Sequence, residues 1–164
     1  TDIGLALVGG GVREPWLRDE VSRRGLDAVT FIPPVPFTEM TDVLALGDAH
    51  LVSLQDIPLF RTTLPSKLQA TLAAGKPVVG ALTGDAADVI RESGAGHVVP
   101  PGDPSALAHA IERLADAGPD RLRALGVSAR SHYESTFSEE TTSQLLLDLL
   151  HEAAGQRSTT GATR

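Results

Sequence analysis

The chain has 164 residues, with 14 Lys or Arg against 21 Asp or Glu and a formal net charge of −7. This length fits one domain that buries a core. The acidic residues are spread along the chain, which argues against a nucleic-acid partner because binding to a polyanion needs a clustered basic face. The sequence contains no cysteine, which excludes a disulfide framework and a thiolate metal site.

The sequence shows no membrane-spanning or signal segment, since no apolar run approaches about 18 residues and no basic start precedes an apolar stretch. We therefore expect a cytoplasmic protein. Residues 155–164 are small and polar, which predicts a disordered tail behind a domain that covers residues 1–154.

Short apolar runs alternate with longer helical patterns along the whole domain. In chain order we expect strand 4–8, helix 14–24, strand 29–32, helix 38–46 with Thr38 as its N-cap, strand 50–54, loop 55–63, helix 65–74, strand 77–82, helix 83–92, strand 96–99, and helices 104–117, 120–135 and 139–153. Five strands that alternate with about seven helices predict an α/β fold, a Rossmann-like doubly wound parallel sheet.

Ligands bind such sheets outside the carboxyl ends of the strands. Four segments follow strand ends in this pattern, namely residues 9–11, 33–36, 55–66 and 83–85. The glycines at 9–11 do not complete a dinucleotide fingerprint, because the position of its last glycine is Glu14. A tight turn beside a nucleotide is the better interpretation.

The two lysines of the chain, Lys67 and Lys76, both lie in the tract that forms the expected helix 65–74. A lysine in the first turn has the wrong sign for the helix dipole, whose N-terminal end already carries unpaired N–H groups. A bound phosphate would satisfy both the N–H groups and the ammonium. Gly75 is expected to end the helix in a left-handed conformation, and Lys76 to complement the negative end of that helix.

Four segments in a fixed order resemble the C-terminal, nucleotide-sugar-binding half of retaining GT-B glycosyltransferases of the group 1 family. They read AHLVSL at 49–54, LPSK at 64–67, LAAGKPVV at 72–79 and VVPPGDPSALA at 98–108. The resemblance covers residues 1–154, and the Lys67–Gln69 region is similar to a bacterial cell-envelope branch that includes amino-sugar transferases acting on lipid-linked acceptors. It implies a donor such as a UDP-sugar and no essential metal or other cofactor.

The resemblance also implies roles for individual residues. Lys67 would be the catalytic residue that stabilises the leaving diphosphate. The donor phosphates would contact Arg61, Thr63, Leu64, Ser66 and Lys67, and the nucleoside would contact Gly9, Pro34, Val35 and Ala70. Taken by themselves, Arg61 could equally be solvated, Ser66 could cap the helix, and Pro34 with Val35 could form a rigid turn.

The chain departs from the family at two places. The family usually has two glutamates eight positions apart, and this chain has Thr62 and Ala70 at those positions. The family also has a strand and glycine-rich loop before the strand at 4–8, so the expected sheet lacks its middle member. The acceptor-binding N-terminal domain would have to be supplied in cis or in trans, and any peripheral membrane contact would belong to the full-length enzyme. The chain alone is expected to be inactive.

Two other functions stay open on the sequence. A non-catalytic nucleotide-binding or interaction module would explain the absent glutamates. A UDP-sugar 2-epimerase shares the architecture, but it needs acidic catalytic residues that the sequence does not reveal. A metal site is not expected, because none of the five histidines has a carboxylate or another histidine four residues away, at the i,i+4 spacing.

Overall fold

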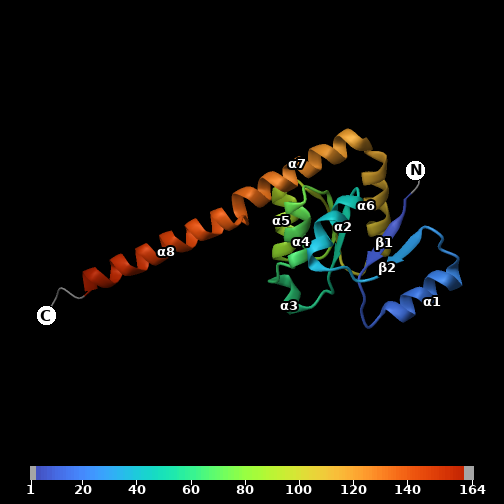
Figure 1. The fold of residues 1–164 in the computed structure, drawn as a ribbon, viewed down its shortest axis with the longest axis horizontal. Helices are drawn as coiled ribbons and strands as arrows, with labels where there is room; N and C mark the ends of the chain where they lie inside the picture. Colours follow the sequence, from blue (N-terminus) through green and yellow to red (C-terminus); the bar gives the residue numbers. More distant parts are fainter. Residues whose placement is uncertain (1–2, 161–164) are drawn as a thin grey trace.

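The computed structural model describes residues 3–160, and the side chains of residues 3–154. It confirms the α/β class, with parallel strands alternating with helices (Figure 1). The strands are β1 (Leu5–Val8), β2 (Val29–Ile32), β3 (His50–Ser53), β4 (Val78–Ala81) and β5 (Gly96–Val99). The helices are α1 (Glu14–Arg24), η1 (Phe37–Glu39), α2 (Met40–Leu46), α3 (Pro58–Arg61), α4 (Ser66–Ala73), α5 (Asp85–Ser93), α6 (Pro104–Asp116), α7 (Gly118–Thr136) and α8 (Glu139–Thr160).

Strand β4 is the centre of the folded core. It pairs in parallel with β3 on one side and β5 on the other, and all of its residues are buried. Its side chains alternate between two apolar clusters: Val78 packs with residues of α4, α5 and α7, and Val79 packs with residues of α6 and α7. A run of small and β-branched residues suits this position because a parallel strand is covered on both faces.

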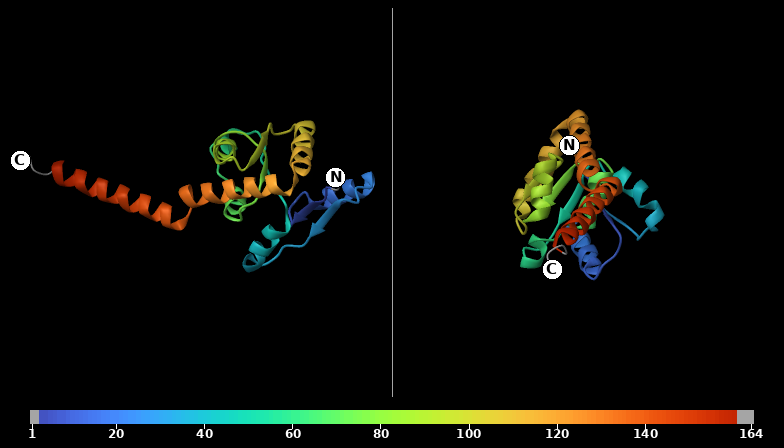
Figure 2. Two further views of the ribbon diagram at one scale, coloured as in Figure 1. Left: turned by 90° about the horizontal axis from the view of Figure 1, so that it is seen from above. Right: turned by 90° about the vertical axis from the view of Figure 1, so that its left-hand side faces the viewer.

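The part of the chain before β3 has no comparable core. Strands β1 and β2 form a separate two-stranded sheet, and no side chain between residues 3 and 51 is buried. Helix α1 is held on this sheet by Arg18, whose guanidinium lies 4.3 Å from the centre of the Phe31 ring. The views in Figure 2 show β1, β2 and α1 beside the main body, which is the part of the chain from β3 onward.

The two sheets are not hydrogen-bonded to each other, since β1 pairs with β2 and β3 pairs with β4. A doubly wound sheet has the order 3-2-1-4-5-6. The observed pairings β2–β1 and β3–β4–β5 fill every place in that order except the first strand. Within residues 3–160 the strands therefore form two separate parallel sheets, and the absence of a middle strand stays a prediction.

Two side chains of the main body hold the C-terminal end of α2. Lys76 Nζ donates to Ala45 O at 2.9 Å, and His50 Nε2 lies 3.0 Å from Leu44 O. Carbonyls in a last helical turn lack intrahelical partners and attract positive groups. The prediction that Lys76 interacts with a helix C-terminus is thus confirmed, but the helix was wrong: Lys76 binds the end of α2 and not the end of α4.

Two local details differ from the sequence prediction, and a third agrees with it. The expected loop 55–63 contains the short helix α3, where Pro58 stands at the first helical position and its fixed φ favours a turn. Thr38 lies inside η1 and caps nothing, since α2 begins after Glu39 without a side-chain cap. Gly75 does adopt the expected left-handed conformation, with φ of 62°.

Helix α8 extends away from the body of the molecule (Figure 1). Its backbone is helical to Thr160, which is six residues into the segment predicted as a tail, because helical hydrogen bonds propagate easily once a turn exists. Residues 161–164 lie outside the described part. No helix within residues 3–160 has the length and apolar character needed to cross a membrane.

We expect the link between α2 and the main body to weaken in acid. Burial holds the pKa of His50 below its ordinary value of 6.5, and the nearby positive charges of Lys76 and Lys67 lower it further, against the opposing effect of the Leu44 carbonyl. A lowered pKa in the folded state means that the unfolded chain binds the proton first as the pH falls. The stability that neutral His50 contributes is therefore complete above about pH 6.5 and is lost below it.

Urea unfolding at pH 8 and pH 5 would measure this effect. His50→Gln keeps a donor for Leu44 O but removes the titration, so the stability difference between the two pH values should become smaller. His97, whose pKa burial also lowers, stays in both proteins as an internal reference. An unchanged pH dependence in His50→Gln would contradict the assignment.

Candidate functional site

The first turn of α4 is open to solvent while the rest of the helix is anchored in the core. Leu68, Thr71 and Leu72 are buried at helical spacing, whereas Ser66 and Lys67 are exposed. Pro65 is the N-cap residue in an extended conformation, and no side chain caps the helix. The capping interpretation of Ser66 is therefore wrong, because Ser66 is the first helical residue and lies past the cap position.

Unpaired donors are present at this turn. Leu68 N donates to Pro65 O at 2.9 Å, but the N–H groups of Ser66 and Lys67 have no backbone acceptor within the described residues. The positive end of the helix dipole adds to them. The Lys67 ammonium makes no hydrogen bond or ion pair with residues 3–160, in contrast to Lys76. This turn can therefore bind an anion with a side chain and two backbone groups.

The loop after β3 and the turn after β4 meet beside α3. Asp56 Oδ1 accepts hydrogen bonds from Arg61 Nε at 3.2 Å and Arg61 Nη2 at 3.0 Å, and Thr83 Oγ1 lies 3.5 Å from the same oxygen. At Gly84, whose φ is 76°, an added Cβ would come within 1.9 Å of Arg61 O. The segments that follow β3 and β4 are therefore in direct contact at the carboxyl ends of these strands.

Two of the residues predicted to bind phosphate already have partners. Arg61 pairs with Asp56, and the Thr63 hydroxyl donates to Leu59 O at 2.7 Å. The Arg61–Asp56 pair is about half exposed, with side-chain exposures of 58% and 49%, so it is weak enough to be exchanged for another anion. Leu64 packs its side chain against the core cluster of α4 and could offer only its backbone. Phosphate contact by these three residues stays a prediction.

The residues predicted to contact a nucleoside fall into two groups. Gly9 ends β1 with φ of 110°, and its N–H donates to Ile32 O at 3.0 Å. The next residue, Gly10, lies against Pro34, and Val35 follows in the same segment. Ala70 is half-buried on α4, one turn after Ser66. The structure thus joins Gly9 with Pro34 on the first sheet and Ala70 with Lys67 on the second.

Sequence reasoning did not single out Asp56 or Thr83. Thr62 and Ala70 leave the site without the family's two carboxylates, and Asp56 is the acidic residue of the segment from 54 to 65. Asp56 and Arg61 carry opposite charges on either side of Pro58, and this pattern is the sequence signal for their ion pair. The part played by Thr83 depends on a contact 27 residues away and has no local signal.

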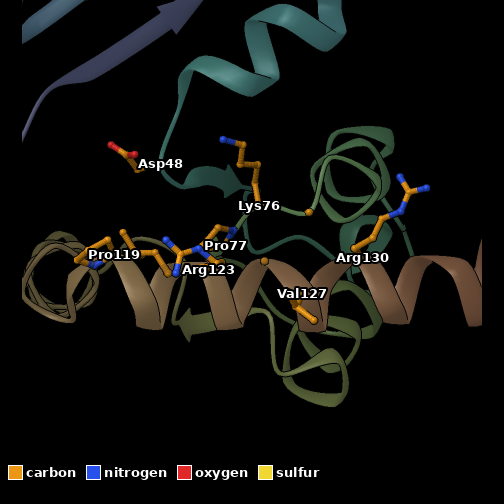
Figure 3. Close-up of a pocket in the computed structure, with 10 residues that line it drawn as sticks. Asp48, Lys76, Pro77, Pro119, Arg123, Val127 and Arg130 are labelled. Carbon is orange, nitrogen blue, oxygen red and sulfur yellow. The ribbon is translucent and has the colours of Figure 1, made fainter.

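A groove of about 450 Å³ lies at the opposite end of the sheet. It is bounded by Asp48 and Pro77, which precede β3 and β4, and by Arg123 and Arg130 of α7 (Figure 3). Both arginines are paired with acids of their own helix, Asp120 and Glu134. The groove is therefore remote from the predicted site.

No group of three or more His, Asp or Glu side chains within residues 3–154 is placed to hold a metal ion. Metal independence nevertheless stays a prediction, because it concerns the reaction.

Comparison with known proteins places the chain in a family. Solved structures share its fold: sucrose-phosphate synthase from Thermosynechococcus elongatus has a TM-score of 0.77 at 24% identity, covering 93% of this chain and 39% of that one. Anabaena HepE in complex with UDP-glucose has a TM-score of 0.73 at 21% identity, over 91% of this chain and 41% of that one. The fold is therefore that of one half of a GT-B glycosyltransferase.

The sequence profile described as "Glycosyl transferases group 1" matches residues 1–117. The chain belongs to this family. Among curated relatives, the probable glycosyltransferase WbjE of Pseudomonas aeruginosa is 31% identical over 142 residues, which are 82% of this chain and 33% of WbjE. A D-inositol 3-phosphate glycosyltransferase of Mycobacterium marinum is 30% identical over 79% of this chain and 27% of its own length. The chain thus spans about a third of the length of these relatives.

We expect Gly84→Ala to detach the α3 loop from the turn after β4. The new Cβ cannot fit beside Arg61 O, so stability should fall by about 1–3 kcal/mol, and trypsin should cleave faster after Arg61. Gly94→Ala is the matched control, because Gly94 has a similar φ of 62° but nothing within 4 Å of an added Cβ. Equal effects of the two substitutions on cleavage after Arg61 would show that the close contact is not what holds the loop.

Proposed function

We propose that this chain is the donor-binding half of a glycosyltransferase that transfers a sugar from a UDP-sugar to a cell-envelope or lipid-linked acceptor in the bacterial cytoplasm. One observation carries the proposal: the Lys67 ammonium and the N–H groups of Ser66 and Lys67 are unpaired at the exposed end of a helix whose other face is fixed in the core. Family membership makes a nucleotide diphosphate the anion to be expected there.

The proposed seat of the diphosphate is the first turn of α4. Backbone N–H groups at a helix N-terminus and an ammonium side chain bind phosphate oxygens together. Arg61 could add a second cation by leaving Asp56, since that pair is exposed to solvent.

The nucleoside would lie across the segments that carry Gly9, Pro34 and Val35, with Ala70 facing it from α4. Backbone groups in these turns can read a base without a charged side chain. Support for UDP comes from HepE, whose structure holds UDP-glucose and which shares the fold. Support for the envelope acceptor is the sequence resemblance around residues 64–79.

The proposed chemistry is electrostatic. Negative charge develops on the diphosphate as the sugar–phosphate bond breaks, and preorganised donors aimed at that charge lower the barrier. The α4 N–H groups are fixed before the reaction because Leu68 and Leu72 anchor the helix, and the exposed Lys67 side chain would reach the same phosphate oxygens. We propose that this step needs no metal or other cofactor.

A non-catalytic nucleotide-binding module is the second candidate, and the replacement of two glutamates by Thr62 and Ala70 favours it. The two proposals agree on nucleotide binding and differ on turnover. Transfer of sugar by the intact polypeptide would decide between them.

We expect Lys67→Ala to weaken UDP binding to the intact polypeptide by roughly tenfold or more, which corresponds to the loss of a charge-assisted hydrogen bond of about 1.5–3 kcal/mol. Calorimetric titration measures the dissociation constant. Lys76→Ala is the matched control, because it removes the other lysine and leaves the α4 turn intact. Similar losses in both variants, with both folded, would refute the phosphate assignment.

The 164-residue chain by itself should transfer no sugar, because the acceptor-binding part lies outside it. A panel of UDP-sugars, with release of UDP as the readout, tests this expectation against the intact polypeptide. Measurable turnover by the chain alone would overturn the proposal that it is one half of an enzyme.

A further inference from the structure

The loop between β3 and α4 carries one carboxylate, that of Asp56, and the structure fixes this group in place. Leu54, at the start of the loop, and Leu64, near its end, both pack against the core cluster around α4. Between these two anchors, Arg61 O lies so close to Gly84, in the turn after β4, that a Cβ at Gly84 would come within 1.9 Å of it. Asp56 is therefore held at the carboxyl ends of β3 and β4.

The described residues use only one of the two oxygens of this carboxylate. Arg61 donates to Asp56 Oδ1 from Nε at 3.2 Å and from Nη2 at 3.0 Å, and Thr83 Oγ1 lies 3.5 Å from the same atom. A fork-to-fork pair would instead place one N–H on each oxygen. Asp56 Oδ2 thus has no donor within residues 3–154, and the side chain is 49% exposed, which leaves it accessible to a ligand.

The free oxygen and the first turn of α4 select opposite kinds of ligand group. An ionised carboxylate accepts hydrogen bonds and donates none, so Asp56 Oδ2 needs a donor such as a hydroxyl and repels a phosphate oxygen. The α4 turn presents the N–H groups of Ser66 and Lys67 and the Lys67 ammonium, which need an acceptor. A ligand that meets both must carry anionic oxygens at one place and hydroxyl groups at another. A sugar diphosphate has this arrangement.

The two groups belong to the same edge of the second sheet. Asp56 and Thr83 follow β3 and β4, and ligands of parallel sheets bind outside these strand ends. Ser66 comes five residues after Arg61, which limits the separation of their Cα atoms to about 18 Å. The anion-binding turn and the fixed carboxylate are therefore neighbours in the chain as well as at the sheet edge.

We propose that Asp56 Oδ2 accepts a hydrogen bond from a hydroxyl group of the donor sugar, and that Arg61 and Thr83 are positioning residues that hold the carboxylate through Oδ1. Asp56 then determines which sugars bind well, because a group placed to pair with a hydroxyl disfavours a sugar in which that hydroxyl is absent or points elsewhere. The inference rests on the proposed function, since it takes the α4 turn as the seat of the diphosphate.

Arg61 can hold Asp56 and face an anion at the same time. A guanidinium has five N–H groups, and two of them are used on Asp56 Oδ1. Three remain, so Arg61 can also contact a phosphate without giving up Asp56. The pair therefore links the part of the site that takes the sugar to the part that takes the phosphates.

Calorimetric titration of the intact polypeptide with UDP, UDP-glucose, UDP-galactose and UDP-N-acetylglucosamine tests the inference. The decisive quantity is the Kd for the UDP-sugar that the unsubstituted protein binds most tightly, divided by the Kd for UDP. Asp56→Asn keeps the size of the side chain but removes its charge, so this ratio should rise by about tenfold or more. The Kd for UDP should change by less than about fivefold, because an exposed ion pair contributes little. Retained UDP binding also shows that the variant is folded.

Asp85→Asn is the matched control. Asp85 is exposed, begins α5 at the same edge of the sheet and makes no ion pair within residues 3–154. The substitution changes the net charge by the same amount, so any general electrostatic effect on nucleotide binding appears in both variants. The ratio in Asp85→Asn should stay close to that of the unsubstituted protein.

Arg61→Lys tests the positioning role. Lysine keeps the positive charge but lacks the rigid fork of donors that holds Asp56 Oδ1. UDP binding should be largely retained, while the ratio rises in the same direction as in Asp56→Asn. A merely structural role of Arg61 would move the dissociation constants of UDP and of the UDP-sugars together.

The remaining outcomes overturn the inference and show which premise is at fault. An equal change for UDP and the UDP-sugars in Asp56→Asn would mean that the pair acts on phosphate binding alone. Unchanged constants would mean that Asp56 touches no ligand, and UDP binding without binding of any of the three UDP-sugars would leave no sugar for it to hold. An intact polypeptide that binds none of the four ligands would refute the proposed function itself, and the inference with it.

Discussion

The pairing of β4 on both edges is the constraint on which the ordered half of this molecule depends. Because β3 and β5 both bond to β4, its side chains must alternate between two apolar layers, and helices must cover both faces. Helix α4 is held by this arrangement through Leu68 and Leu72, and its first turn is thereby presented at the strand ends. The exposure of the N–H groups in this turn is thus a product of core packing, with no contribution from a cap.

The same constraint explains why the two halves differ. Residues after β3 pack around a strand with two neighbours, while β1 and β2 have only each other and bury no side chain. His50 and Lys76 hold α2 by its last carbonyls, which ties the halves together at one end without giving the first a core. The residues predicted to form the site are divided between the two sheets.

Much of the fold was predictable, because five apolar runs alternate with helical patterns and the ends of most elements carry glycine or proline. The break between β2–β1 and β3–β4–β5 agrees with the order of segments that resemble the family. The short helix α3, the failure of Thr38 to act as a cap, and the partner of Lys76 were not. The partner of Lys76 depends on a contact between segments distant in sequence, and the contact of Thr83 with Asp56 belongs to the same category.

The contrast between the two lysines has a practical consequence. Lys67 is exposed with a free ammonium, whereas Lys76 is half-buried with its ammonium bonded to a carbonyl. The chain has no third lysine and no cysteine. An amine-selective acylating reagent should therefore modify the Lys67 side chain faster than that of Lys76, whose ammonium is hydrogen-bonded. Mass spectrometry of the acylated peptides could then report occupancy of the α4 turn directly, with Lys76 as the built-in standard.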